Sequence, residues 1–294
     1  IAAFDAPPGK LRKEMAAADD EQPLLKLPGF RIGKSGIEKT YDQDLRGVAG
    51  ATHVEVNAYG RVIRELSKDQ GKPGSEIVLT LDMEIQKFAY ERLKKESASA
   101  VVMDIHTGDV LSFVSTPAFD PNEFNMGLSQ DQWKMLVDNP YKPLTNKAIA
   151  GLYPPGSTFK TMTAIAALEA GIDPNHTVGC NGKYALGNHL FHCWKKEGHG
   201  AVNMHDAIKH SCDVYFYDVA KRVGIDAISK VASRFGLGET YDLEIPGEKK
   251  GIVPTREWKR ATTGVSWQQG ETLITGIGQG FLLRNLRHDH VRAN

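Results

Sequence analysis

Hydrophobic positions follow two different periods along this chain. In the first part they alternate with polar residues in short runs bounded by glycine turns, as in His53–Asn57 and Arg61–Arg64. A period of two residues is typical of β-strands. In the segment Lys160–Phe235, apolar residues instead recur three positions apart, as at Met162 and Ile165, which predicts helices. The chain therefore divides into a β-rich first part and a mainly helical second part.

The stretch between these two parts has signals of its own. Ile77–Leu81 predicts a short strand, and Met83–Glu96 has the spacing of an amphipathic helix. Two further runs, Ala100–Ile105 and Val110–Val114, flank a turn that contains glycine, so we expect them to pair as a hairpin. Ile1–Pro23 is alanine-rich, charged and broken by proline, and we interpret it as a loose connector.

Composition narrows the class of protein. The 294 residues carry 36 basic and 36 acidic side chains, and a chain of this length predicts two domains. The charge balance gives no sign of nucleic acid or of an anionic membrane surface as a partner. No apolar run approaches the roughly 18 residues of a membrane-spanning helix, and residues 1–21 lack the pattern of a signal peptide. Because the first residue is not methionine, we expect the chain to start inside a longer protein.

The most informative stretch is Gly151–Lys160, where two prolines and a glycine force a sharp turn just before Ser157. A helix that begins at Ser157 places the side chain of Lys160 one turn away on the same face. A neutral lysine there can remove the serine proton and make the hydroxyl a nucleophile. The spacing S-x-x-K is the nucleophile motif of serine β-lactamases and penicillin-binding proteins. The alternative for a bare motif is a helix cap beside a solvated lysine, and the apolar stripe that follows argues against it.

A second motif follows at Ser211 and Asp213. The same enzymes carry S-x-N or S-x-D on a loop between helices, where the serine shuttles protons and the amide or acid binds the active-site lysine. The alternative is that Ser211 or Asp213 caps the helix that begins near Val214. Both interpretations can hold together, since a capping loop is rigid enough to position a catalytic group.

Six separate stretches of the chain share one resemblance. They are Phe30–Glu38, Gly60–Arg64, Ala100–Asp104 through Phe119–Asn122, Tyr153–Lys160, Trp194–Gly200 and Gly276–Gly280. The chain resembles the class B penicillin-binding proteins, specifically the elongation-type peptidoglycan D,D-transpeptidases, over roughly residues 25–283. The resemblance implies an α+β fold with a transpeptidase domain like that of the serine β-lactamases, in which a helical subdomain accompanies an antiparallel sheet. It also implies that the end of an elongated, β-rich pedestal domain comes first.

The resemblance also implies domain boundaries. Residues 1–74 correspond to the C-terminal part of the pedestal, or dimerisation-like, domain. Residues 75–283 correspond to a transpeptidase domain whose sheet is incomplete. We interpret residues 284–294 as an aberrant tail, because this segment has no amphipathic period and no apolar face. A truncation or a shifted reading frame would produce such a tail.

The activity that the resemblance implies is acyl transfer. Ser157 would be the nucleophile, Lys160 its base, Ser211 a proton shuttle, and Asp213 the partner of the lysine. The backbone amide of Ser157 would be one of two oxyanion donors. The substrate would be the stem peptides of peptidoglycan, cross-linked during cell elongation and rod-shape maintenance, and β-lactam antibiotics would bind the same serine. The resemblance further implies a membrane glycosyltransferase as partner and a location at the periplasmic face of the bacterial inner membrane, with the anchor outside this chain.

One departure from the family matters for activity. The third family motif, K-S/T-G on a strand of the cleft, has no counterpart after Ser211, and Lys34–Gly36 is too far upstream. We therefore expect this chain to acylate more slowly than a complete domain. We also expect the hairpin of Ala100–Ile105 and Val110–Val114 to lack a neighbouring strand, which would leave an exposed edge prone to aggregation.

Two other functions stay open for the sequence. One is a catalytically inactive, zinc-stabilised fragment that binds a partner. The other is a serine enzyme that hydrolyses β-lactams. The pedestal-like segment 30–66 argues against the hydrolytic enzyme, since free-standing β-lactamases lack it, and no group suited to activate a deacylating water is evident.

The three cysteines form a further signal, together with one histidine. Cys180, Cys193, His199 and Cys212 follow the spacing Cys-x12-Cys-x5-His-x12-Cys. A Cys3His set can close a tetrahedron around zinc, and some members of the family carry a metal site at the matching positions. The alternatives are a Cys180–Cys193 disulfide and three free thiols. We expect a structural zinc ion here, because Cys212 lies inside the second motif.

Overall fold

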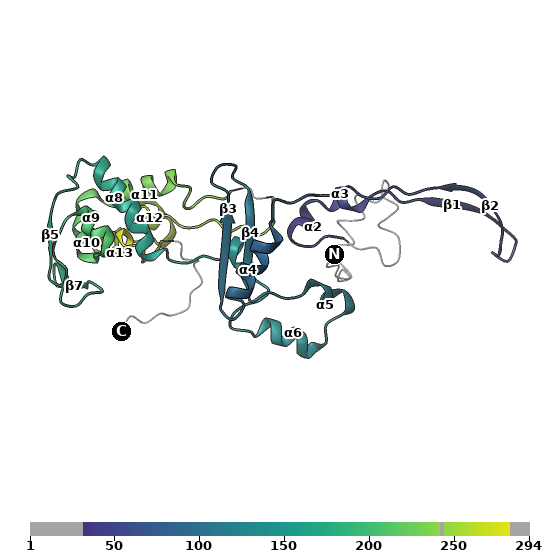
Figure 1. Cartoon of the computed structure of the whole chain (residues 1–294), viewed down its shortest axis with the longest axis horizontal. Coiled ribbons are helices and arrows are strands. Elements are labelled where there is room, and N and C mark those ends of the chain that lie inside the picture. The colour runs from purple at the N-terminus through teal and green to yellow at the C-terminus, as the bar shows by residue number, and fades with distance from the viewer. Residues whose placement is uncertain (1–31, 242–243, 283–294) are drawn as a thin grey trace. The chain divides into compact units, whose positions relative to one another are not determined.

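The structure is a computed structural model, and it describes residues 32–241 and 244–282. The expected connector Ile1–Pro23 and the expected tail at 284–294 lie outside the described residues. The chain forms two compact units. Of the described residues, 32–151 and 244–248 belong to unit 1, and 152–241 and 249–282 belong to unit 2. Figure 1 shows the elements of each unit along the chain.

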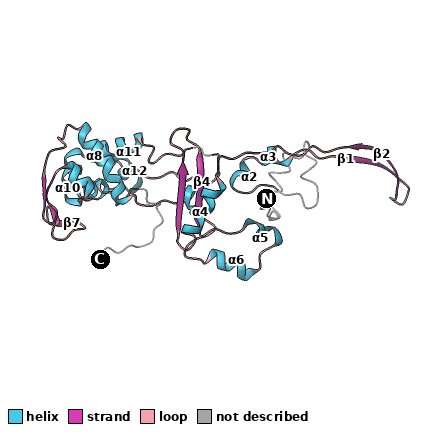
Figure 2. Cartoon of the chain, in the orientation of Figure 1, coloured by secondary structure: helices cyan, strands magenta, loops and turns pink. Residues whose placement is uncertain are grey.

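Unit 1 combines two β-hairpins with short helices (Figure 2). Its elements are α2 (Gly36–Thr40), α3 (Asp42–Arg46), β1 (Ala51–Val56), β2 (Val62–Asp69), α4 (Met83–Leu93), β3 (Ala98–Met103), β4 (Val110–Thr116), α5 (Pro121–Met126), α6 (Gln130–Val137) and α7 (Lys147–Ala150). Strands β1 and β2 pair antiparallel, where the alternating pattern predicts strands. The side chain of Asn57 accepts hydrogen bonds from the amides of Tyr59 and Arg61, which closes the turn between them.

The second hairpin carries helix α4. Strands β3 and β4 pair antiparallel, and Gln86 of α4 binds β4 through both atoms of its amide. Its Oε1 accepts from the amide of Phe113 at 2.7 Å and its Nε2 donates to the carbonyl of the same residue at 3.1 Å. Asp82 caps α4 by accepting from two amides of the first turn. The helix and hairpin predicted from the sequence are therefore confirmed.

The strand predicted at Ile77–Leu81 is wrong. This segment has no strand pairing in the structure, although Thr80 donates to the carbonyl of Val110 and the amide of Asp82 donates to the carbonyl of Leu111. Val78 and Leu79 are exposed, so these two apolar side chains do not face a core. In the described part of the chain, β3 and β4 form a sheet of two strands.

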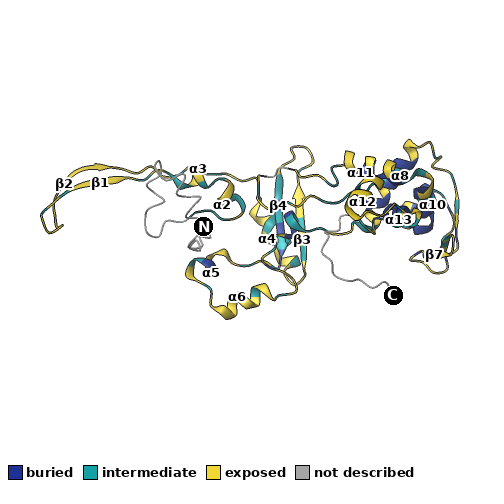
Figure 3. Ribbon diagram, turned by 180° about the vertical axis from the view of Figure 1, so that it is seen from behind, coloured by how far each residue is buried: buried dark blue, intermediate teal, exposed yellow. Residues whose placement is uncertain are grey.

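Unit 2 is built around one central helix. Its elements are η2 (Gly156–Phe159, a 3₁₀ turn), α8 (Lys160–Glu169), β5 (Val178–Cys180), β6 (Lys183–Leu186), β7 (His189–His192), β8 (Gly200–Val202), α9 (Met204–Lys209), α10 (Asp213–Val223), α11 (Ile225–Arg234), α12 (Arg256–Thr263) and α13 (Gln269–Gly276). Helix α10 packs against α8 and α13, and its residues Tyr215, Phe216 and Val219 are completely buried. Buried residues gather on these three helices in Figure 3.

The connection between α8 and α9 departs from the helical prediction. It contains two antiparallel strand pairs, β5 with β8 and β6 with β7. Cys180 ends β5, and Cys193 follows β7 directly. The two pairs therefore bring residues 180, 193 and 199 toward the start of α10, where Cys212 lies.

Candidate active site

The turn that carries Ser157 places its hydroxyl at the surface and the following residues in the core. Gly156 has φ of +59°, a conformation that glycine adopts without steric cost. Ser157 lies in the 3₁₀ turn η2, and α8 begins at Lys160. Ser157 is exposed while Phe159 and Lys160 are buried. The predicted helix start is thus confirmed, with a 3₁₀ first turn and Gly171 just beyond the helix end.

Lys160 is held by acceptors from the second motif. Its Nζ lies 2.6 Å from Oδ1 of Asp213, and it donates to Oγ and to the carbonyl of Ser211, each at 2.9 Å. The side chain of Lys160 is 3% exposed, so these contacts replace its hydration. A buried ammonium group needs such partners, because an unpaired buried charge is costly.

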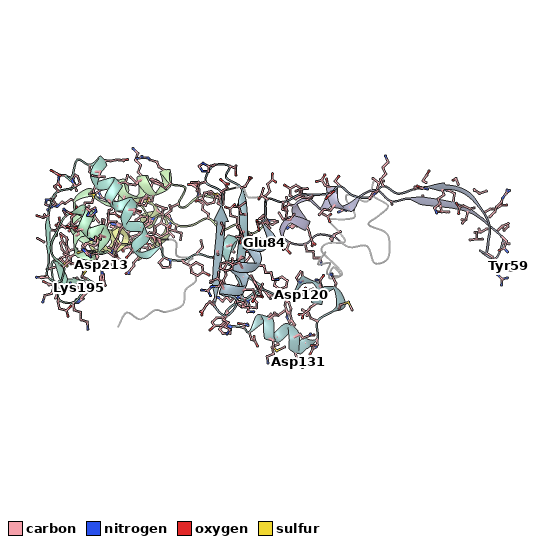
Figure 4. All side chains as sticks on the ribbon, viewed as in Figure 1. Tyr59, Glu84, Asp120, Asp131, Lys195 and Asp213 are labelled. Atoms are coloured by element: carbon pink, nitrogen blue, oxygen red, sulfur yellow. The ribbon has the colours of Figure 1, made fainter. Side chains whose placement is uncertain are left out.

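Ser211 connects the lysine to the exposed serine. Its hydroxyl donates to Oγ of Ser157 at 2.9 Å, so an unbroken line of hydrogen bonds joins Ser157, Ser211, Lys160 and Asp213. Ser211 has φ of +52°, a left-handed conformation that is uncommon for residues other than glycine and that occurs often at functional sites. The structure thus brings together all four residues singled out in the two sequence motifs. Asp213 is labelled among the helices of unit 2 in Figure 4.

The alternative of a helix cap at Ser211 or Asp213 is wrong. The N-cap of α10 is Cys212, and its side chain makes no capping hydrogen bond. Asp213 is the first residue of the helix, and its carboxylate binds Lys160 through Oδ1 and the amide of Trp194 through Oδ2 at 3.0 Å. Both carboxylate oxygens therefore serve the site rather than the helix end.

Trp194 is a residue of the site that the sequence analysis did not single out. Its indole Nε1 donates to the carbonyls of His210 and Ser211, each at 3.1 Å, and its backbone amide binds Asp213. The ring is 64% exposed, so Trp194 contributes little to a core. The sequence feature that could have indicated a role for Trp194 is its position directly after Cys193, at the start of the stretch Trp194–Gly200.

The four candidate metal ligands form one compact cluster. The ligand atoms of Cys180, Cys193, His199 and Cys212 all lie within 4.8 Å of one another. His199 Nδ1 is 3.6 Å from the sulfur of Cys180 and 3.6 Å from that of Cys193. In a tetrahedral site with the usual zinc bond lengths, sulfur and nitrogen ligands are roughly 3.5 Å apart. The residues present therefore fit a zinc ion.

Protonation in this cluster follows from burial and hydrogen bonding. Burial raises the pKa of Cys212 to about 12. For Cys180, burial raises the pKa, but hydrogen bonds from the backbone of Gly182 and His199 and from the other two thiols outweigh it, so the pKa is lowered overall. Burial, with the nearby Lys195 and His210, lowers the pKa of His199. A neutral imidazole is the form that coordinates a metal.

The arrangement suits acyl transfer. An exposed hydroxyl is linked through a second hydroxyl to a buried amine, which is the geometry in which a proton can leave a serine nucleophile. The Cys3His cluster is adjacent to this line in sequence, since Cys212 stands between Ser211 and Asp213. In the described part of the chain, no helix is long and apolar enough to cross a membrane.

Comparison with known proteins identifies the family. The family described as penicillin binding protein transpeptidase domain matches residues 98–286, and the penicillin-binding protein dimerisation domain matches residues 9–79. The chain belongs to the penicillin-binding protein transpeptidase family. The fold expected from the resemblance is therefore confirmed. The boundaries at residues 74 and 283 stay predictions.

Named relatives point to one branch of that family. The chain is 42% identical over 253 residues to the peptidoglycan D,D-transpeptidase MrdA of Escherichia coli strain K12, a match that covers 85% of this chain and 40% of that protein. The resemblance to the elongation-type transpeptidases, also named penicillin-binding protein 2, is thereby confirmed. The chain spans well under half the length of the curated relative that it matches.

Solved structures agree with this placement. A complex between penicillin-binding protein 2 and MreC from Helicobacter pylori matches with a TM-score of 0.81 and 36% identity, covering 92% of this chain and 50% of that chain. A peptidoglycan synthase complex, described as coordinating polymerization and crosslinking, matches with a TM-score of 0.73 and 33% identity, covering 90% of this chain and 49% of that chain.

Proposed function

We propose that this chain carries the serine acyl-transfer centre of a peptidoglycan D,D-transpeptidase that acts in cell elongation. The observation that carries the proposal is the line of hydrogen bonds from Ser157 through Ser211 to Lys160 and Asp213. The similarity to a peptidoglycan D,D-transpeptidase over 85% of the chain supports the same reaction.

The reaction has two acyl transfers. Oγ of Ser157 attacks the carbonyl carbon of the D-Ala–D-Ala bond in a stem peptide. Its proton passes through Ser211 to Lys160 as the lysine passes one of its own protons to Oδ1 of Asp213, 2.6 Å away. The C–N bond breaks, its nitrogen takes up a proton, and D-alanine departs. The acyl group of the stem peptide stays bound to Ser157 as an ester. An amine of a neighbouring stem peptide then attacks that ester, loses a proton, and releases Ser157 with the cross-link formed. The amide of Ser157 stabilises the oxyanion in both transfers.

A β-lactam ring opens on the same serine, so penicillin labelling tests the proposal. We expect a fluorescent penicillin to label the wild-type chain covalently and to label Lys160→Ala and Ser211→Ala at least about 100-fold more slowly. Thr158→Ala is the matched control, because Thr158 lies beside Ser157 and its hydroxyl bonds to Pro155 instead. Failure of the folded wild-type chain to label would refute the proposal. Rapid release of the label would indicate a β-lactam-hydrolysing enzyme instead.

We further propose that one structural zinc ion binds Cys180, Cys193, His199 and Cys212. When bound, zinc supplies a cross-link between the β5–β8 connection and the start of α10, and no step of the acyl transfer involves it. The support is the compact cluster and the 3.6 Å separations of His199 Nδ1 from two sulfurs. Loss of the His199 ligand would loosen the loop that holds Ser211, because the zinc ligand Cys212 is the next residue in the chain.

Elemental analysis of protein purified without chelator tests the zinc proposal. We expect about one equivalent of zinc in the wild type, and much less in His199→Ala, with slower penicillin labelling in that variant. His205→Ala is the control, since the side chain of His205 is exposed and contacts Asp206. Less than about a tenth of an equivalent of zinc, together with a mapped Cys180–Cys193 disulfide, would show that the cluster is not a metal site.

The location and the partners follow from the proposed reaction. We propose that the chain acts at the periplasmic face of the inner membrane, where stem peptides are cross-linked, and that a membrane glycosyltransferase which polymerises glycan strands is its partner. The match to a synthase complex of polymerization and crosslinking supports that partner, and the match to a complex with MreC supports a second one. Cross-linking in living cells followed by mass spectrometry of captured proteins tests both, and recovery of neither partner would contradict this assignment.

A further inference from the structure

We propose that Gly278 is a positioning residue that sets the direction of the Ser157 N–H bond, and so the oxyanion donor. This inference rests on the proposed function for its catalytic consequence. Gly278 lies two residues after the end of α13, far from Ser157 in sequence, and makes no contact with a substrate in this account. Its effect would act through the backbone of the nucleophile turn, the 3₁₀ turn η2 (Gly156–Phe159) that contains Ser157.

The two segments meet backbone to backbone. The amide of Gly156 donates to the carbonyl of Gly278 at 2.9 Å. A Cβ atom added to Gly278 would lie 2.0 Å from the carbonyl oxygen of Gly156, 2.7 Å from its carbonyl carbon and 2.8 Å from its nitrogen. All three separations are below the 3.0 Å that Cβ atoms keep from other heavy atoms, and the first is below it by about 1 Å. The turn can hold this position because residue 278 has no side chain.

The carbonyl of Gly156 and the amide of Ser157 belong to one planar peptide unit. A side chain at position 278 therefore cannot displace the Gly156 oxygen without also turning or shifting the Ser157 N–H. An oxyanion donor works only when it points at the developing charge. A displacement of about 1 Å at a reacting centre can reduce the rate about 100-fold.

The segment that carries Gly278 is itself anchored to the nucleophile helix. Thr163 of α8 is fully buried, and its hydroxyl donates to the carbonyl of Gly276 at 2.8 Å. The turn after α13 is thus tied to both ends of the nucleophile segment, at Gly156 and at Thr163. The backbone contact with Gly156 transmits the position of Gly278 to Ser157, and the Thr163 hydroxyl holds the turn after α13 in place.

Gly280 provides a matched control. Its φ of +76° nearly equals the +79° of Gly278, so alanine imposes the same backbone strain at both positions. A Cβ atom on Gly280 would meet the side chain of Ile274 at 3.3 Å and no backbone atom of the nucleophile turn. Any difference between Gly278→Ala and Gly280→Ala therefore reports the contact with Gly156.

The first experiment measures penicillin acylation of the whole chain. We expect Gly278→Ala to lower the acylation rate constant about 100-fold while the affinity of the preceding non-covalent complex changes little. Gly280→Ala should keep the wild-type rate constant within about threefold. Equal rate constants for the two variants, with wild-type labelling intact, would overturn the role of Gly278 and leave the proposed function standing.

The second experiment reads the N–H direction without any reaction. The residual dipolar coupling of the Ser157 amide in ¹⁵N-serine-labelled protein depends on the direction of that bond, and Ser157→Ala identifies its signal. We expect the coupling to change in Gly278→Ala and to stay in Gly280→Ala, and an unchanged coupling in both overturns the inference. If the wild type does not label with penicillin, the proposed function fails, and this coupling still decides the role of Gly278.

A milder pair of variants covers the case in which Gly278→Ala does not fold. Thr163→Val removes the hydrogen bond to Gly276 and keeps the side-chain volume, whereas Thr163→Ser keeps the hydroxyl. We expect Thr163→Val to acylate about tenfold more slowly and to shift the Ser157 coupling, and Thr163→Ser to restore both. Identical rates and couplings in the two variants would contradict the proposal.

Discussion

Cys212 is the residue at which the two candidate sites meet. Its sulfur lies in the Cys3His cluster, while its neighbours Ser211 and Asp213 both bind Lys160. Trp194 makes a second connection, since it follows Cys193 and donates to Ser211. A change at the Cys3His cluster therefore has a short covalent route to the residues around the nucleophile.

The buried pair of Lys160 and Asp213 predicts a large stability effect. The two side chains are 3% and 12% exposed, so neutralising one leaves a buried charge without its partner. We expect Asp213→Asn to lower the free energy of unfolding by about 3 kcal/mol, as measured by urea denaturation. The same variant should also lose penicillin labelling.

A double variant separates charge from packing. Lys160→Met combined with Asp213→Asn removes the buried ammonium group, and the carboxamide oxygen then present at position 213 can still accept from the amide of Trp194. We expect this double variant to recover most of the stability lost in Asp213→Asn and none of the labelling. If the double variant is no more stable than Asp213→Asn alone, the loss comes from packing and not from the unpaired charge.

The sequence motifs predicted which residues meet, and they did not predict all the contacts. Ser157, Lys160, Ser211 and Asp213 were identified because S-x-x-K and S-x-D each fix a short spacing on a helix start. The capping alternative was wrong because Lys160 and Trp194 occupy both oxygens of Asp213. Contacts of that kind join residues far apart in sequence, and no local pattern contains them.

At the scale of elements, helix α7 buries a lysine. Lys147 is 5% exposed, and its Nζ donates to the carbonyl of Lys142 at 3.2 Å. Among the described residues no carboxylate pairs with it in a salt bridge. Burial lowers the pKa of Lys147 below its usual value of 10.5, because the charged form is poorly hydrated there.

This shift gives a pH-dependent prediction. The unfolded chain binds the Lys147 proton more tightly than the folded chain does. The buried charge therefore lowers the free energy of unfolding fully at neutral pH, and this destabilisation decreases as the pH rises toward 10.5. We expect Lys147→Met to raise the free energy of unfolding by about 1 kcal/mol at pH 7, and this gain to shrink at pH 10 and above. Denaturation curves of both proteins at the two pH values test it, and a gain that does not depend on pH would exclude burial of the charge as its cause.

The strand pairs between α8 and α9 predict where metal removal acts. Strands β5–β8 have three or four residues each, which is too short for independent stability. With zinc bound, we expect slow hydrogen exchange in residues 178–202 and at the start of α10. A chelator should speed exchange there at least about tenfold and leave α11 and α12 nearly unchanged.

Cys193→Ser is the control for this measurement. It removes one ligand with little change in volume, so the chelator should have no further effect on its exchange. Uniform acceleration over all helices of unit 2 would argue against a local metal cross-link. So would an absence of any chelator effect in the wild type.

Short elements also mark the limit of the sequence analysis. Helices α4, α8 and α10 were predicted correctly, because the helical spacing of apolar residues repeats over many positions in these segments. The strands at 178–202 were missed because three or four residues, interrupted by glycine, contain too few repeats of a period. Ile77–Leu81 was assigned wrongly for the opposite reason: its residues favour a strand, but the structure gives them no strand partner.

At the scale of the whole molecule, the edge of β3 predicts self-association. Val101, Val102 and Met103 are exposed on this strand, which has β4 as its one neighbour among the described strands. An unpaired apolar edge favours pairing with a second chain. We expect Val101→Lys to reduce concentration-dependent association in analytical ultracentrifugation. Leu66→Lys on the exposed strand β2 is the control, and equal effects of the two substitutions would contradict a role for the β3 edge.

The family matches explain why the fold was predictable as a whole. The dimerisation and transpeptidase families match residues 9–79 and 98–286, and the six resembling stretches are distributed over both. The packing of Gly278 against Gly156 was not predictable, since a glycine in a sequence does not show which backbone approaches it. Only the fold brings those two turns together.

The most direct test of the acyl-transfer centre is intact-mass spectrometry of the chain after reaction with penicillin. We expect a single adduct with the mass of one penicillin, located by digestion on the peptide that contains Ser157, and no adduct in Ser157→Ala. An adduct that persists in Ser157→Ala, or that maps to another peptide, would contradict the assignment of Ser157 as the nucleophile.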